Sequence, residues 1–210
     1  MARVVKPRTR RAEKSEETRR RILDAASALF ARHGFTGTTI DAIAAEADVA
    51  VETVYSRFKN KTNLLDAILG PAITGRDDAS TVFDRPEIEE VRASRDQRRQ
   101  VRLMASFSRG ILERTHGVHR ILHAAAAVDA NAARLEKEDR QRRRQSQGAY
   151  IEMLLANGPL RAGLTAELAA DSYAALANPQ TYEFFVDQLG WAPRRFETWL
   201  ADAFERLLLD

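Results

Sequence analysis

Apolar residues recur along most of the chain at the three- and four-residue spacing that places them on one face of a helix. The pattern is densest over residues 38–58, where two short apolar stripes are separated by a break at Asp48. The first stripe centres on Ile43, and the second turns Val54 and Phe58 inward. Two short helices joined by a tight turn are typical of a helix-turn-helix, whose second helix enters the major groove of DNA.

Further helices are predicted on both sides of this pair. One spans about residues 15–32 and ends at Gly34, which suits a helix C-terminus. Another begins after Asn60, a residue whose side chain is suited to capping a helix N-terminus. Residues 1–14 lack apolar periodicity and are predicted to form a flexible basic arm, which either contacts DNA or is simply a solvated tail.

A domain boundary is predicted just beyond these helices. Gly70 and Pro71 should break or kink the chain, and residues 70–86 hold two glycines and two prolines. We therefore expect a first domain over residues 1–69, made of the arm and the helix-turn-helix. The second domain then covers residues 70–210.

The second domain also has a helical pattern throughout. Gly117 is expected to separate two of its helices, and Asn178-Pro179 to interrupt another. The predicted helices cover about residues 96–114, 118–128, 131–157, 165–178, 182–189 and 193–207. No stretch has the alternating pattern of a strand, so we predict an all-α protein of about nine helices, with a three-helix head and a helical body.

Composition excludes several classes of protein. At 44% hydrophobic and 30% charged residues the chain resembles an ordinary globular protein. It has no run of 18 apolar residues and no apolar signal segment near Met1, so we expect a cytoplasmic protein that does not enter a membrane. It has no cysteine, which excludes disulfides, thiolate catalysis and cysteine-ligated metals.

The net charge is only +3, but the positive charge is concentrated near the N-terminus. Residues 1–21 hold nine lysines and arginines against three glutamates. A basic segment next to a predicted helix-turn-helix indicates a polyanionic partner at that end of the chain. Double-stranded DNA is the partner that fits both features.

Three segments carry a resemblance to a known family. They read TRRRILDAASALFARHGF, GTTIDAIAAEADV and ETVYSRFKNKTNLLDAIL, and together they cover about a quarter of the chain. In this order they resemble the DNA-binding domain of the tetracycline-repressor (TetR) family of transcriptional regulators. Two positions depart from the family pattern. Asp48 stands where the family usually has Gly, and Asp tolerates the left-handed backbone that the turn needs. Ala50 stands where the family often has a capping Ser.

The resemblance implies phosphate contacts by Tyr55, Lys61 and Thr39. The remaining outward-facing residues of the second helix are candidates for reading base edges. Arg57 suits guanine and Glu52 suits cytosine, although Arg57 is as well suited to a phosphate contact. The predicted DNA-binding residues are Thr39, Val51, Glu52, Thr53, Tyr55, Ser56, Arg57 and Lys61.

For the body, the resemblance implies a ligand cavity between the middle helices and a homodimer made by the last two. Apolar and aromatic residues of the middle helices are either cavity lining or plain core; the ligand-binding candidates are Met104, Phe107, Ile111, Tyr150, Met153 and Tyr173. Residues of the last two helices are either dimer contacts or core of one subunit; the dimer candidates are Phe185, Leu189, Trp199 and Phe204.

His116, His119 and His123 are spaced so that they would share one side of a helix and could bind a metal. We prefer pocket-lining or surface histidines, because Gly117 should interrupt the helix between the first two. We therefore predict no metal site and no cofactor.

The sequence favours a regulator over an enzyme. It contains no GxSxG, HExxH or glycine-rich phosphate loop. The predicted function is a homodimeric repressor that a small apolar effector releases from its DNA operator. The alternatives are a DNA-binding dimer without a ligand, controlled by abundance or serving an architectural role, and a regulator controlled by a protein partner.

Overall fold

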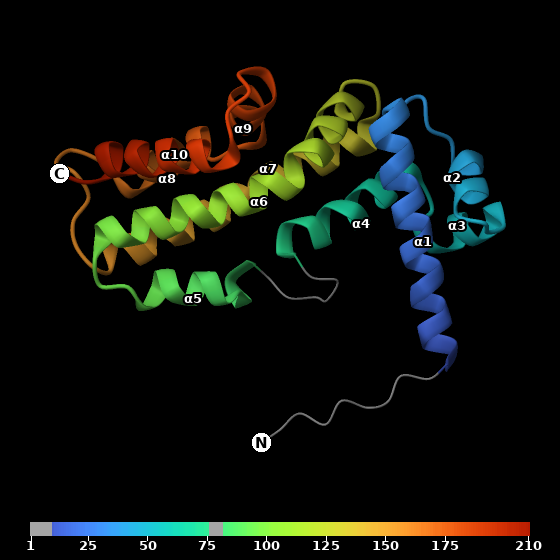
Figure 1. Ribbon diagram of the computed structural model, residues 1–210, viewed down its shortest axis with the longest axis horizontal. Coiled ribbons are helices and arrows are strands. Elements are labelled where there is room, and N and C mark those ends of the chain that lie inside the picture. The colour runs from blue at the N-terminus through green and yellow to red at the C-terminus, as the bar shows by residue number, and fades with distance from the viewer. Residues whose placement is uncertain (1–9, 76–81) are drawn as a thin grey trace. The chain divides into compact units, whose positions relative to one another are not determined.

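In the computed structural model, the described residues are 10–75 and 82–210, and every regular element among them is helical (Figure 1). They fall into two compact units that divide between Ile68 and Leu69, a position inside α4. The first unit holds α1 (Arg10–His33), α2 (Ile40–Glu46), α3 (Val51–Phe58) and the start of α4 (Lys61–Thr74). The second holds the short η1 (Val82–Asp84), α5 (Pro86–Ala93), α6 (Gln97–Ala126), α7 (Ala130–Leu155), α8 (Ala166–Leu176), α9 (Pro179–Glu183), the π-helical turn η2 (Phe184–Gln188) and α10 (Pro193–Leu208).

Capping side chains explain where many of these helices begin. The side-chain oxygens of Thr39, Asp96, Asp129, Thr165 and Asn178 each accept a hydrogen bond from a backbone N–H in the first turn of the following helix. These caps satisfy N–H groups that have no partner within the helix. The sequence therefore specifies the helix starts locally.

The core of the body is built around two long helices. α6 and α7 pack against each other, and α5 and α10 lie along opposite sides of α6 (Figure 1). α8 packs against α7 and α10. Fully buried side chains such as Met104, Leu154, Phe196 and Phe204 fill the space between these helices.

Two predicted interruptions are absent. α6 continues through Gly117, where a Gly in place of Ala costs only about 1 kcal/mol. The buried Leu112, His119 and Leu122 pack on both sides of Gly117, and this packing outweighs that cost. α4 likewise is not broken at Pro71 but continues to Thr74, since a proline this close to the helix end removes a single hydrogen bond. The other predicted outcome, a kink at Pro71, stays a prediction.

Other expectations concern residues that the structure does not describe. Of the predicted arm, residues 1–9 lie outside the described residues, whereas Arg10 to Lys14 form the first turns of α1. Part of the predicted junction, residues 76–81, also lies outside them. Within the described residues, no helix is both long enough and apolar enough to span a bilayer.

Candidate nucleic-acid interface

The turn between α2 and α3 has the backbone that the sequence predicts. Thr39 caps α2, its hydroxyl accepting a hydrogen bond from the Ala42 N–H at 3.1 Å. Asp48 has a φ of 51°, so it adopts the left-handed conformation in place of the usual Gly. The N–H of Val49 then donates to the Ala44 carbonyl at 3.0 Å and closes the turn.

α3 separates its residues into a buried and an exposed face. Val54 and Phe58 are buried, whereas Glu52, Tyr55, Ser56 and Arg57 are exposed, and Val51 and Thr53 are half-buried. Half of the Tyr55 surface is accessible to solvent. On this exposed face the hydroxyl and the guanidinium can donate hydrogen bonds to phosphates and base edges, and the carboxylate can accept one from a base amino group.

Two polar contacts hold residues of this surface against α1. The Arg57 guanidinium donates to the Ser15 hydroxyl at 3.1 Å, and Arg21 lies 3.9 Å from the Asp48 carboxylate. Both contacts are exposed, and exposed contacts of this kind contribute at most about 1 kcal/mol. Arg57 can therefore leave Ser15 for a nucleic-acid contact at little cost. Sequence reasoning missed the position of Arg21, which faces the turn although it lies on α1.

Lys61 occupies a different environment from the one expected. Its ammonium donates to the carbonyls of Phe35 and Thr38 at 2.7 and 2.8 Å, and it lies 4.4 Å from the centre of the Phe35 ring. These bonds fix the loop between α1 and α2. The phosphate contact of Lys61 stays a prediction, and any loss of DNA binding on its replacement has to be separated from a loss of stability.

The ligand-binding candidates lie together in the core of the body. Met104, Phe107, Tyr150 and Tyr173 are buried, and Ile111 and Met153 pack against the same core. The rings contact one another: Tyr150 is 6.1 Å from Phe107 and 5.8 Å from Tyr173, between ring centres. The candidates thus lie close together with their side chains packed on each other, and their contact with a ligand stays a prediction.

A hydrogen-bonded chain fixes the phenol of Tyr173. The Ser108 hydroxyl donates to the Met104 carbonyl at 2.6 Å, so the Tyr173 hydroxyl, 2.6 Å away, is left to donate to Ser108. Burial raises the pKa of Tyr173 far above its usual value, although the bond to Ser108 opposes this effect. Tyr173 is therefore a neutral hydrogen-bond donor in the core.

The dimer candidates divide into two groups. Leu189 is half exposed, and Phe185 and Trp199 are partly exposed with their ring centres 4.4 Å apart. Phe204 is completely buried and stacks on Tyr173 at 4.6 Å. The prediction that Phe204 contacts a partner is therefore wrong, because its subunit already covers it on all sides. Phe184, which is 46% exposed, is a better candidate for a dimer contact. The helical spacing of the apolar residues did not indicate this position.

The three histidines share one continuous helix, but each faces a different carboxylate. The pairs are His116 with Asp187 at 3.5 Å, His119 with Asp139 at 3.1 Å and His123 with Glu136 at 2.7 Å. In the part of the chain that the structure describes, no three such side chains are grouped to hold a metal ion. The histidines instead connect α6 to η2 and α7.

Comparison with known proteins agrees with this geometry. Residues 22–68 match the sequence model of the bacterial regulatory proteins of the tetR family. The repressor KstR of Mycobacterium tuberculosis is 42% identical over 69 residues, which are 33% of this chain and 31% of KstR. The regulator TtgR of Pseudomonas putida is 28% identical over 170 residues, which are 77% of this chain and 75% of TtgR. The alignments with the first curated relatives span about a third of those proteins, 31% and 28% of their lengths.

The fold of the whole chain has solved counterparts. A transcriptional regulator from Saccharomonospora viridis, solved in complex with choline, superposes with a TM-score of 0.69. The superposition covers 93% of this chain and 99% of that one at 22% identity, and at that identity the likeness concerns the fold. The matched segment contains the capped α2, the left-handed turn and the exposed face of α3 described above. Residues 22–68 therefore match the DNA-binding segment of the tetR family of bacterial regulatory proteins, and the whole chain shares its fold with solved transcriptional regulators.

Proposed function

We propose that this protein is a transcriptional regulator that binds double-stranded DNA as a homodimer and responds to a small molecule. The exposed face of α3, positioned by the turn at Asp48, is the observation that carries the proposal. A helix exposed in this way after a tight turn fits the major groove, and its Tyr55 and Arg57 supply the contacts. Repression is the mode of action that the relatives support, since several of them are named repressors.

The proposal requires two kinds of DNA contact that can be measured separately. An operator is first selected from random duplexes with the protein itself, and affinities for this operator and for random DNA are then compared. Tyr55→Phe should weaken both about fivefold, because it removes one hydrogen bond of about 1 kcal/mol to a phosphate. Arg57→Ala should mainly reduce the preference for the operator.

A stability control accompanies these variants. Lys61→Ala removes two bonds to backbone carbonyls in addition to a charge, so its thermal unfolding has to be recorded with its DNA affinity. Equal losses on operator and random DNA for Arg57→Ala would contradict its role in base reading, because a phosphate contact alone carries no sequence information.

The effector proposed from the sequence is a small apolar molecule among Phe107, Ile111, Tyr150 and Tyr173. These side chains pack closely, so such a molecule has to displace Tyr150 or Tyr173 from its ring contacts. A ligand lowers DNA affinity only when it binds the non-binding arrangement more tightly. Titration of the operator complex with hydrophobic compounds tests this, and a Tyr173→Ala variant with unchanged responses would place the effector elsewhere.

The close packing of these aromatic side chains is also compatible with the alternatives in which no small molecule binds. A body filled by its own aromatic side chains suits a dimer controlled by a protein partner or by abundance. Under these alternatives no small molecule releases DNA, whereas the dimer and the DNA contacts are retained.

A further inference from the structure

We propose that a polar hollow between α7 and the α8–α9 segment binds a small molecule that carries an oxyanion, a carboxylate or a phosphate. That the bound molecule acts as an effector depends on the proposed regulatory function. That the hollow binds a molecule is argued from its geometry alone. Its volume is about 510 Å³, a size suited to small metabolites. Its lining residues are His123, Glu136, Arg140, Arg143, Arg144, Gln147, Ala174, Ala175, Asn178 and Gln180.

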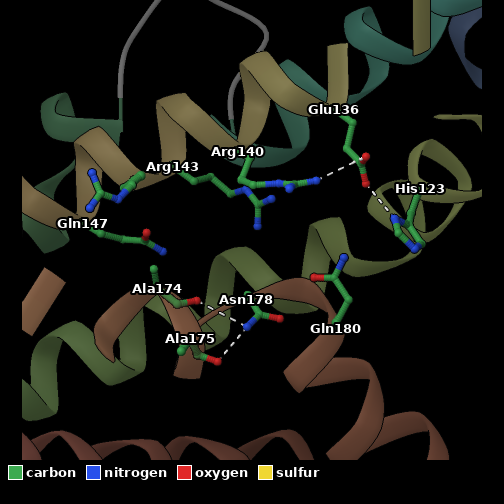
Figure 2. Close-up of a pocket in the computed structure, with 10 residues that line it drawn as sticks. His123, Glu136, Arg140, Arg143, Gln147, Ala174, Ala175, Asn178 and Gln180 are labelled. Carbon is green, nitrogen blue, oxygen red and sulfur yellow. Dashed lines mark hydrogen bonds and ion pairs between the residues drawn. The ribbon is translucent and has the colours of Figure 1, made fainter. Parts of the chain in front are cut away.

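Positive charge dominates this lining. The lining contains three arginines from α7, Arg140, Arg143 and Arg144, and a single carboxylate, that of Glu136. Figure 2 shows Glu136 joined to Arg140 and to His123. Opposite the arginines, the α8–α9 segment contributes small or uncharged side chains, those of Ala174, Asn178 and Gln180 among them. An oxyanion between the two walls would be attracted by the arginines. The nearby α8 carboxylates, those of Asp171 and Glu167, do not line the hollow and pair with Arg144, so the attraction falls mainly to Arg140 and Arg143.

Each arginine keeps hydrogen-bonding capacity for a ligand. Arg143 donates through Nε to Asp139 at 2.9 Å, and Arg140 contacts Glu136 through Nη2 at 3.3 Å. Arg144 pairs with Asp171 through Nε and Nη2, and its Nη2 also lies 3.5 Å from the Glu167 carboxylate. A guanidinium has five N–H donors, and these contacts use one or two of them in each residue. The carboxylates therefore orient the arginines and do not saturate them.

Gln147 provides the second, independent observation. It is only 7% exposed, yet its amide makes no hydrogen bond with any residue that the structure describes. In Figure 2 the amide points from α7 toward the hollow. The amide atoms line the hollow and are not sealed from solvent, so they are available to a molecule that enters from outside the chain. Asn178, by contrast, donates to the Ala174 and Ala175 carbonyls and accepts from the Thr181 N–H.

The chemistry of these groups defines the class of ligand. Guanidinium groups bind carboxylates and phosphates through paired N–H donors, whereas the neutral amide of Gln147 can either donate or accept. A compact polar acid that bears a carbonyl or hydroxyl beside its oxyanion satisfies both. This hollow therefore selects a different class of molecule from the aromatic core.

Calorimetric titration of the full chain without DNA, at fixed pH and ionic strength, tests the proposal. The probes are citrate and inorganic phosphate, with triethyl citrate as the uncharged control. We expect saturable binding of an oxyanion probe and none of the ester. Stronger binding of citrate would assign the site to carboxylates, and stronger binding of phosphate would assign it to phosphates.

Two variants locate the binding in the hollow. Gln147→Met keeps the side-chain length and removes the amide, and Arg140→Gln removes one guanidinium; each should weaken binding at least tenfold. Arg134→Gln is the matched control, because Arg134 is also an exposed α7 arginine paired four residues away, with Glu138, but lies outside the hollow. The affinity of Arg134→Gln for the oxyanion probe should stay within twofold of the wild-type value.

The unliganded proteins supply a readout that needs no ligand. Because the Gln147 amide lacks a protein partner, Gln147→Met should unfold at the same temperature as the wild type or a higher one. A clear loss of stability in this variant would show that the amide has a structural partner, and would overturn the proposal. So would the absence of saturable binding of both probes, or an equal loss of affinity in Arg134→Gln.

DNA binding is measured in parallel, so that the two proposals fail separately. Wild-type protein that binds DNA but no oxyanion refutes the hollow and leaves the regulatory function intact. Protein that binds the oxyanion but no DNA refutes the regulatory function alone. Release of the operator by the bound probe would identify the hollow as an effector site.

Discussion

A single buried carboxylate, that of Asp139, connects the two longest helices of the body. It is 1% exposed, lies 3.1 Å from His119 Nε2 on α6, and accepts a bond from Arg143 on its own helix. Burial alone would raise the pKa of Asp139, but the hydrogen bond from His119 and the charges of His119 and Arg143 lower it overall. The carboxylate is therefore held in its charged form.

This arrangement predicts a defined dependence of stability on pH. Because the folded-state pKa of Asp139 is below its unfolded value of 3.8, its stabilisation is complete above about pH 4 and is lost as the pH falls below that. Asp139→Asn should lower the free energy of unfolding at pH 7 by about 3 kcal/mol, as for a broken buried pair. Denaturant titrations from pH 3 to 7 should also show that the free energy of unfolding falls less on acidification in the variant than in the wild type.

The left-handed turn residue allows a second prediction at the same scale. Asp48 has a positive φ and a fully exposed side chain, so little besides the backbone depends on it. Asp48→Ala should destabilise the head by about 1 kcal/mol, since alanine tolerates this conformation poorly. Asp48→Gly should be neutral or stabilising. A higher unfolding temperature for Asp48→Ala than for Asp48→Gly would contradict a conformational role for this residue.

Among the elements, α6 shows where helix prediction from sequence succeeds and fails. Local signals such as Thr39, Asp96 and Asn60 mark helix starts correctly, because a cap depends only on neighbouring backbone. Gly117 misled, because the packing of α6 outweighs a local preference of about 1 kcal/mol. Pro71 misled because it lies so close to the end of α4 that the helix loses little there. The hollow beside Gln147 could not be predicted, since its walls come from segments almost 30 residues apart.

The continuity of α6 can be tested with a glycine substitution. A Cβ added at Gly117 meets no atom within 4 Å, so Gly117→Ala should raise the free energy of unfolding by about 1 kcal/mol. The control is Gly158→Ala, where the new Cβ would lie 2.8 Å from the Gln97 side chain, which bonds three backbone carbonyls there. That variant should be destabilised. A loss of stability in Gly117→Ala would imply that the helix bends at this residue.

For the molecule as a whole, the exposed apolar residues near the C-terminus bear on assembly. Leu189 and Phe184 are each about half exposed, next to the cluster of Phe185, Trp191 and Trp199. We expect a dimer by light scattering at micromolar concentration. Leu189→Asp should shift the mass to that of a monomer, because a charge would be buried in the contact. Val128→Asp, which changes an exposed apolar residue between α6 and α7, should remain dimeric.

The basic N-terminus makes a further prediction for the whole chain. Residues 1–9 hold Arg3, Lys6 and Arg8 and no acidic residue. If all three contact phosphates, their removal should reduce the slope of log affinity against log salt by up to about three per chain. Fluorescence anisotropy at several salt concentrations measures this slope. An unchanged slope would show that these residues do not contact DNA. That result would favour the other interpretation of the sequence, a solvated tail.

The π-helical turn η2 has a consequence for how this chain can vary in length. The Leu189 N–H donates to the Phe184 carbonyl five residues back, so this turn contains one residue more than an α-helix would. Removing one residue here would rotate the preceding part of the helix by about 100° relative to the residues after the turn. The contacts of Phe185 with Trp191 and Trp199 would then be lost together. Related chains that lack the extra residue should therefore carry their aromatic residues in shifted positions, so that an insertion or deletion in this turn is inherited only together with compensating substitutions.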